Sequence, residues 1–148
     1  MHRVIGMTMV GLLGCTPGTA KQSGDAVSDY EWEPGATEPI IQNGEVYCTT
    51  GVSGVTLTYI NVIANDPQGL SDLKEGEWFA YSLETDELIA SDVLYCDGQE
   101  CIYSYHAEQY PSLPCRQLSE FAFWAVVWDW SGNETTPMQL TVLGEQSE

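Results

Sequence analysis

From Glu45 onward the chain consists of short apolar runs in which β-branched and aromatic residues are interrupted by Gly, Pro, Asp and Asn. Such a pattern is typical of β-strands joined by turns. Seven strands in about 100 residues, with no helix, predict an all-β fold, a single immunoglobulin-like antiparallel β-sandwich. An up-and-down barrel is the alternative, although it favours more evenly spaced hairpins. The strands are expected at residues 45–50, 54–65, 76–83, 87–96, 101–106, 119–129 and 137–143.

Two of these strands run into similar turns, Asp66-Pro67-Gln68-Gly69 and Asp129-Trp130-Ser131-Gly132 followed by Asn133. In each turn we expect the Asp to accept hydrogen bonds from backbone amides just beyond it, and the Gly to adopt positive φ. The turns resemble those of bacterial immunoglobulin-like and fibronectin-III-like modules, where strands B and F each run into an Asp-x-x-Gly turn. The resemblance covers about residues 44–144, and it implies a fold but no catalytic residues.

The same two turns define a candidate metal site. Strands B and F of such a sandwich run the same way in opposite sheets, so Asp66 and Asp129 should lie at one pole. With Asp72, Asn133 and Glu134 they supply oxygen ligands of the kind that calcium takes. Because no spacing matches an EF-hand, turn formation is the alternative role for these side chains.

The predicted strand 119–129 is apolar on both faces. An antiparallel sheet that is exposed on one side should carry polar residues there. Either another part of the chain covers the outward face, or that face is a binding platform of tryptophans. Phe121, Phe123, Ala125 and Val127 are expected to point inward, Ala122, Trp124, Val126 and Trp128 outward, and Trp130 follows the strand.

The N-terminus has the features of an export signal. After a basic start comes the apolar run Val4–Gly14, which is too short to span a bilayer but fits the h-region of a signal peptide. Its end, Leu12-Leu13-Gly14-Cys15, resembles the bacterial lipoprotein box, in which the cysteine carries diacylglycerol and becomes the mature N-terminus. The resemblance implies a signal peptide over residues 1–14, a lipid anchor on Cys15 and, by the identity of Thr16, the outer membrane.

Residues 15–43 predict a flexible acidic tether, because they are rich in Pro and Gly and lack a sustained apolar period. Tyr30 and Trp32 are large aromatic residues within this tether. They could fold back onto the domain and help to bury the outward tryptophans. The sandwich is expected over 44–144, with a C-terminal tail at 145–148. No second apolar run is long enough for a membrane helix, so the lipid is the predicted contact with the membrane.

Four cysteines remain after the lipidation site, and an even number in an exported chain indicates two disulfides. A zinc site is the alternative, but it usually shows two close pairs of ligands, and here only one pair is close. Residues 97–100 would form a hairpin loop that places Cys96 opposite Cys101. We therefore predict the disulfides Cys96–Cys101 and Cys48–Cys115.

The charge of the chain limits the classes of molecule that it can bind. It has 22 Asp and Glu against 4 Lys and Arg, a formal net charge of −18, which argues against binding to nucleic acid. His106 is the only histidine outside the signal peptide, and Gly51-Val52-Ser53-Gly54-Val55 lacks the final Gly of a nucleophile elbow. No arrangement of residues meets the requirements of an active site, so the sequence predicts a protein without catalytic activity.

Together these features predict a lipid-anchored protein of the bacterial cell envelope with a recognition or adhesion domain. Its contact surface is expected to include Trp124, Trp128 and Trp130, and its partner to be an unknown envelope protein or a glycan. A structural or inhibitory lipoprotein that acts by protein contact is the alternative. No cofactor is expected, with calcium at Asp66 and Asp129 as the one candidate.

Overall fold

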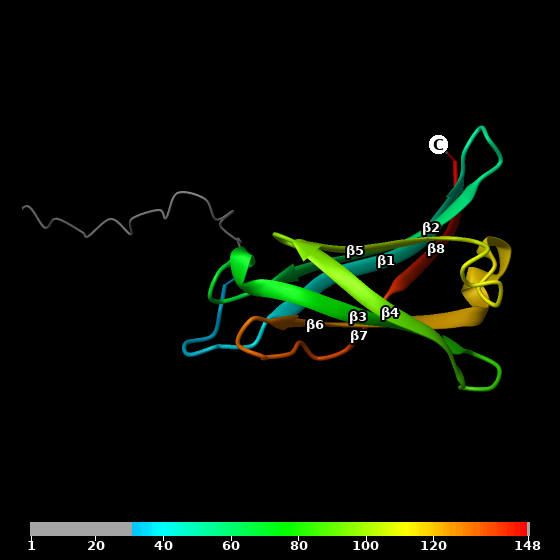
Figure 1. The fold of residues 1–148 in the computed structure, drawn as a ribbon. Coiled ribbons are helices and arrows are strands. Elements are labelled where there is room, and N and C mark those ends of the chain that lie inside the picture. The colour runs from blue at the N-terminus through cyan, green and yellow to red at the C-terminus, as the bar shows by residue number, and fades with distance from the viewer. Residues whose placement is uncertain (1–30, 148) are drawn as a thin grey trace, which may run out of the picture.

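The computed structural model describes residues 31–147, so the predicted signal peptide, Cys15 and most of the tether lie outside the described residues. The described chain is almost entirely β-structure (Figure 1), which confirms the all-β prediction. Its elements are β1 (Ile40–Thr50), β2 (Thr56–Asn65), the 3-10 helix η1 (Leu70–Asp72), β3 (Leu73–Ser82), β4 (Leu88–Asp97), β5 (Glu100–His106), the 3-10 helix η2 (Cys115–Glu120), β6 (Phe121–Asp129), β7 (Met138–Gln139) and β8 (Thr141–Gln146).

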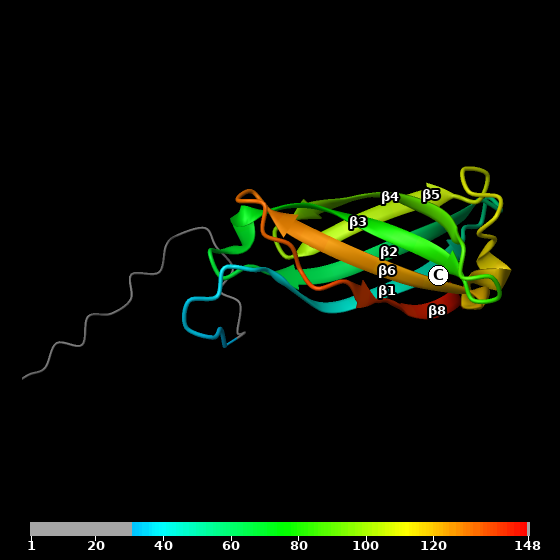
Figure 2. The same ribbon diagram turned by 90° about the horizontal axis from the view of Figure 1, so that it is seen from below.

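The strands form two packed layers, as the prediction of a sandwich requires. One layer holds β1, β2, β5 and β8, and the other holds β3, β4, β6 and β7 (Figures 1 and 2). The hydrogen-bonded order is β7-β6-β3-β4-β5-β2-β1-β8, because the hairpin between β4 and β5 joins the layers through the pairs from Tyr95–Ile102 to Asp97–Glu100. The two layers are therefore parts of one continuous eight-stranded sheet that folds over on itself like a barrel.

The predicted last strand, 137–143, is divided in two. β7 pairs with β6 and β8 pairs with β1, so the chain changes layers at Leu140. The Leu140 amide donates to the Phe123 carbonyl, and its buried side chain lies against Gly44, where a Cβ would collide with it. The pair β1 and β8 is parallel, so the expectation of a purely antiparallel sandwich is wrong at this position.

The first strand begins earlier than expected. β1 starts at Ile40, where Ile40 pairs with Asn65 and Ile41 with Ala64, so the sheet includes the last residues of the predicted tether. A register shift between Ile41 and Asn43 allows the strand to continue through this polar stretch. At the other end β8 reaches Gln146, inside the predicted tail, and the first two residues of the predicted strand 119–129 belong to η2.

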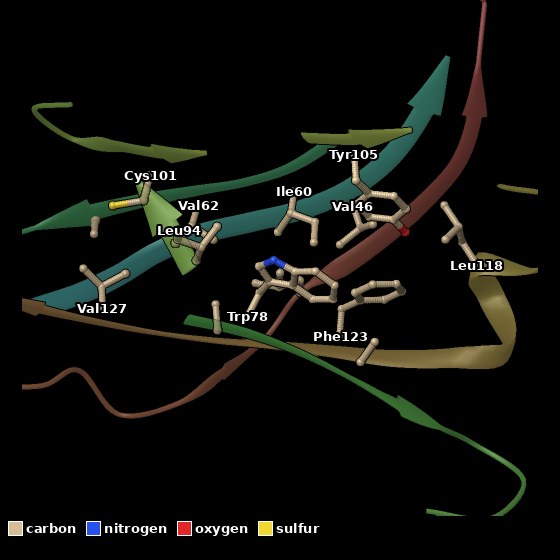
Figure 3. Close-up of a cluster of buried hydrophobic side chains, with 14 of the residues drawn as sticks. Val46, Ile60, Val62, Trp78, Leu94, Cys101, Tyr105, Leu118, Phe123 and Val127 are labelled. Atoms are coloured by element: carbon tan, nitrogen blue, oxygen red, sulfur yellow. The ribbon is translucent and has the colours of Figure 1, made fainter. Parts of the chain in front are cut away.

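The core lies between the layers and is centred on Trp78 of β3 (Figure 3). Its ring lies 5.5–6.2 Å, centroid to centroid, from the rings of Tyr103, Tyr105, Tyr110 and Phe123. In β6 the residues predicted to point inward are Phe123, Ala125 and Val127, which are buried, and Phe121, which is half-buried. The period-2 pattern of this strand is therefore confirmed.

Both predicted disulfides are present. Cys48 of β1 bonds to Cys115 at the start of η2, with 5.9 Å between the Cα atoms, and so ties one layer to the segment that leads into β6. Cys96 and Cys101 are opposite residues in the β4–β5 hairpin, with 3.9 Å between the Cα atoms. A hairpin brings its flanking residues together, which explains why this pair was predictable.

Beyond the hairpin, β4 and β5 are joined by side chains. The Asp92 carboxylate of β4 accepts a hydrogen bond of 2.7 Å from the hydroxyl of Tyr103 in β5 and another of 2.7 Å from that of Tyr110. The two hydroxyl donors lower the pKa of the Asp92 carboxyl below its ordinary value. This carboxylate therefore connects the two layers where backbone pairing between β4 and β5 has ended.

Candidate functional site

An open groove of about 1140 Å³ lies beside β6, between the segment that precedes β1 and the segment that leads into β7. Figure 2 shows β6, β7 and the start of β1 on this side of the molecule. Its volume is slightly larger than the about 300–1,000 Å³ that is common for ligand pockets. The lining residues are Trp32, Glu33, Gly35, Ala36, Thr37, Glu38, Pro39, Ile40, Ile41, Gln42, Trp124, Thr136, Pro137, Met138 and Gln139.

The lining combines apolar and polar groups. Two tryptophans, Trp32 and Trp124, come from segments far apart in the sequence, and Met138 adds an apolar side chain. The side-chain amides of Gln42 and Gln139 supply both donors and acceptors of hydrogen bonds. Among the described residues that line the groove there are carboxylates but no Lys, Arg or His, so an anionic ligand is disfavoured.

The three tryptophans of the predicted contact surface do not share one site. Trp124 is half-buried and lines the groove, opposite Gln139 in the pairing of β6 with β7. Trp128 is half-buried too, but it lies outside the groove lining and pairs with Glu75 and Glu134. Trp130 is 66% exposed, with the Lys74 ammonium 5.3 Å from its ring centroid.

Several groove residues were not predicted as site residues. The sequence indicates Trp32 as a residue that could fold back over the outward tryptophans, but not as part of a binding site, and it assigns Pro137 and Met138 to a strand. The segment before β1 contributes one wall of the groove beside Trp124, so the outward face of β6 is partly covered by the chain itself. The outward face of β6 was expected to be either covered by another part of the chain or open as a binding platform. The structure shows it partly covered, with an open groove beside Trp124.

The two Asp-x-x-Gly turns form as expected, and both lie at one pole, together with residues 31–39 (Figure 1). Gly69 and Gly132 have φ of 119° and 87°. The Gln68 amide donates to Asp66 Oδ1 at 2.7 Å, and the Asn133 amide donates to Asp129 Oδ1 at 2.8 Å. Each aspartate therefore closes its own turn.

The same pole brings three carboxylates together. Asp66 follows β2, Asp72 ends η1 and Asp129 ends β6, and one oxygen of each lies within 4.8 Å of those of the other two. Asp66 is 3% exposed and Asp129 is 1% exposed, whereas Asp72 is half-buried. Burial raises the pKa of the Asp66 carboxyl to about 6, with further increases from the charges of Asp72 and Asp129, against the opposing effect of the Gln68 amide.

Comparison with known proteins gives no further assignment: no protein-family model matches the chain, and no curated protein is similar to it in sequence. Within residues 31–147 no helix has the length and apolar character needed to cross a membrane.

Proposed function

We propose that this protein is a lipid-anchored component of the bacterial cell envelope whose sandwich is a non-catalytic recognition module, and that the groove beside β6 binds a neutral oligosaccharide. The observation that carries the proposal is the groove itself, with Trp32 and Trp124 beside the side-chain amides of Gln42 and Gln139. Ligand sites are concave, largely apolar and furnished with a few placed polar groups.

The chemistry of the lining favours a neutral sugar over other ligands. Indole rings offer flat apolar surface for the C–H faces of a sugar ring, and the amides and carboxylates offer partners for its hydroxyl groups. The carboxylates of Glu33 and Glu38 repel anionic ligands. Anionic glycans and phosphate-bearing ligands are therefore poor candidates, whereas an uncharged oligosaccharide suits the lining in its charge and in its mixture of apolar and polar groups.

A contact with another envelope protein is the second candidate, and a different surface supports it. Tyr95 of β4 and Ile102 of β5 are directly paired in the hairpin, and both side chains are exposed, Tyr95 by 68%. Exposed aromatic and aliphatic residues side by side are common in the contact surfaces of proteins. This surface would serve a structural or inhibitory lipoprotein without use of the groove.

Replacing Trp124 with alanine is expected to abolish oligosaccharide binding while the domain stays folded. The change removes the ring from the groove, and because Trp124 is half-buried the loss of stability should be smaller than the about 3–5 kcal/mol of a core aromatic. Isothermal titration calorimetry of the full-length protein with neutral oligosaccharides of glucose, N-acetylglucosamine and mannose measures binding without depending on the tryptophan that is replaced.

Trp130→Ala is the matched control, because the same ring is removed at an exposed position outside the groove. It should leave the titration unchanged. Binding that survives Trp124→Ala, or the absence of binding to every neutral oligosaccharide tested, would contradict the groove proposal. If binding to another envelope protein is then lost on Tyr95→Ala, the protein-contact function is favoured.

The lipid anchor is supported by the Leu12-Leu13-Gly14-Cys15 sequence. Substituting Cys15→Ser removes the thiol that would carry diacylglycerol, so the protein should move from the membrane fraction to the soluble fraction of the cells that make it. Fractionation followed by immunoblotting measures this. The anchoring proposal fails if the wild-type protein is equally soluble without detergent.

A further inference from the structure

We propose that Asp66, Asp72 and Asp129 bind one calcium ion at the pole of the sandwich where β2 and β6 end. The three carboxylates come from separate segments, and their oxygens lie within 4.8 Å of one another. Calcium binds oxygen ligands at about 2.3–2.6 Å, so two ligands on opposite sides of one ion lie about 5 Å apart at most. The observed separations satisfy this limit.

A second observation points to a ligand at this position. Asp66 is 3% exposed, and its Oδ2 atom is buried without a hydrogen-bond partner among residues 31–147, while Oδ1 is bonded to the Gln68 amide. A buried carboxylate oxygen without a partner is costly, and a buried charge needs an opposite charge or a metal. This free oxygen is the feature that a turn-forming aspartate alone does not explain.

Within residues 31–147 no basic side chain forms an ion pair with these three carboxylates. Lys74 and Arg116 are the only Lys and Arg residues within residues 31–147. The Lys74 ammonium forms an ion pair with Glu75 at 3.4 Å. The charges that act on Asp66 are those of Asp72 and Asp129, and both are negative. Three carboxylates without a basic partner form a site that a divalent cation would neutralise.

The two buried aspartates differ in what they offer to the ion. Both oxygens of Asp129 accept hydrogen bonds from Asn133, which fixes the orientation of the carboxylate and leaves lone pairs free, since a carboxylate oxygen can accept more than one contact. Asp72 is half-buried, so water can complete the coordination on its side. Calcium accepts such a mixed, irregular shell, whereas magnesium demands a near-octahedral one at about 2.0–2.1 Å.

Bound calcium would connect three segments that belong to both layers. The end of β2 lies in one layer and the end of β6 in the other, and η1 lies between β2 and β3. The Asp72 carbonyl already accepts the Trp130 amide at 2.9 Å, so the loops are in place without rearrangement. Because the cluster belongs to the folded chain only, binding should stabilise the fold.

The test is thermal unfolding of the full-length protein at pH 7.4 in EDTA, in 10 mM CaCl2 and in 10 mM MgCl2, at equal ionic strength. A dissociation constant of about 10⁻⁴–10⁻³ M, as in extracellular calcium modules, predicts a rise in Tm of roughly 5–15 °C with calcium. Isothermal titration calorimetry with CaCl2 should give one ion per chain, and magnesium should produce a clearly smaller shift.

Asp72→Asn is the decisive variant, since it removes one charge from the cluster at a half-buried position and is expected to fold. It should lose most of the calcium-dependent shift. Asp97→Asn, the same change in the exposed β4–β5 hairpin, should keep the full shift and so controls for general screening of an acidic protein. An equal shift in Asp72→Asn, an equal effect of magnesium, or no shift with calcium in the wild-type protein would overturn the proposal.

Discussion

Replacing Trp78 with alanine is expected to lower the free energy of unfolding by about 3–5 kcal/mol, the usual cost of a fully buried large aromatic. Trp78 is fully buried between the layers (Figure 3), and its ring centroid lies 5.5–6.2 Å from the centroids of four other aromatic rings. Truncation removes these contacts and leaves a cavity that the two sheets can close only in part. Since small domains are stable by about 5–15 kcal/mol, the loss is a large share of the total.

Denaturant unfolding followed by circular dichroism measures this loss. Trp130→Ala is the control, because it removes the same side chain from an exposed position and should change stability by no more than about 0.5 kcal/mol. A Trp78→Ala loss no larger than that of Trp130→Ala would show that the core is not organised around this ring.

Removing the Cys48–Cys115 disulfide by a double substitution with alanine is expected to cost about 4 kcal/mol. The bond joins residues 67 positions apart, so its loss releases a long loop in the unfolded chain. The double substitution also removes the covalent link between β1 and the segment that leads into β6. The measurement is the unfolding free energy of each variant in non-reducing buffer, with comparison of the m-values, because a less compact unfolded state changes m.

The Cys96–Cys101 bond gives the matched comparison. Its sequence separation is 5, so the corresponding double alanine variant should lose only about 2 kcal/mol by the same loop-entropy relation. The two variants therefore rank the bonds by loop length. If the hairpin variant is the less stable of the two, the entropic explanation is wrong and strain or packing in the folded state dominates.

Local chemistry explains what was predictable. The hairpin disulfide and the two Asp-x-x-Gly turns depend on residues within a few positions of one another, so the sequence contains nearly all the information that determines them. The inward face of β6 was also predictable, because alternation along a strand has a fixed period of two. The start of β1 at Ile40 was missed since the polar Gln42 and Asn43 interrupt the apolar pattern, and a register shift accommodates them.

The groove could not be predicted in the same way. It exists because Trp32 and Trp124, about ninety positions apart, line the same space, together with the segment around Met138. The sequence showed that the outward face of β6 was unusually apolar and indicated the segment around Trp32 as a possible cover, but it did not indicate that an open groove remains between them. Trp128 likewise lies outside the groove, where it pairs with Glu75 and Glu134, and Trp130 follows the end of β6, so their positions depend on strand pairing and strand length and not on residue type.

By itself, the sequence determined the approximate positions of most strands, their inward faces and the hairpin cysteine pair, since periodicity and turn chemistry are largely local properties. The Cys48–Cys115 pair followed as the two cysteines that remained, and the common pole of Asp66 and Asp129 followed from the expected sandwich topology. The tertiary structure decided the rest. Leu140 passes between the layers where Gly44 leaves room, so the last strand divides and joins the two sheets. Of the candidate ligands that the sequence suggested, folding brings the carboxylates of Asp66, Asp72 and Asp129 together, and it makes Trp32 one wall of the groove, because only folding brings distant segments into contact.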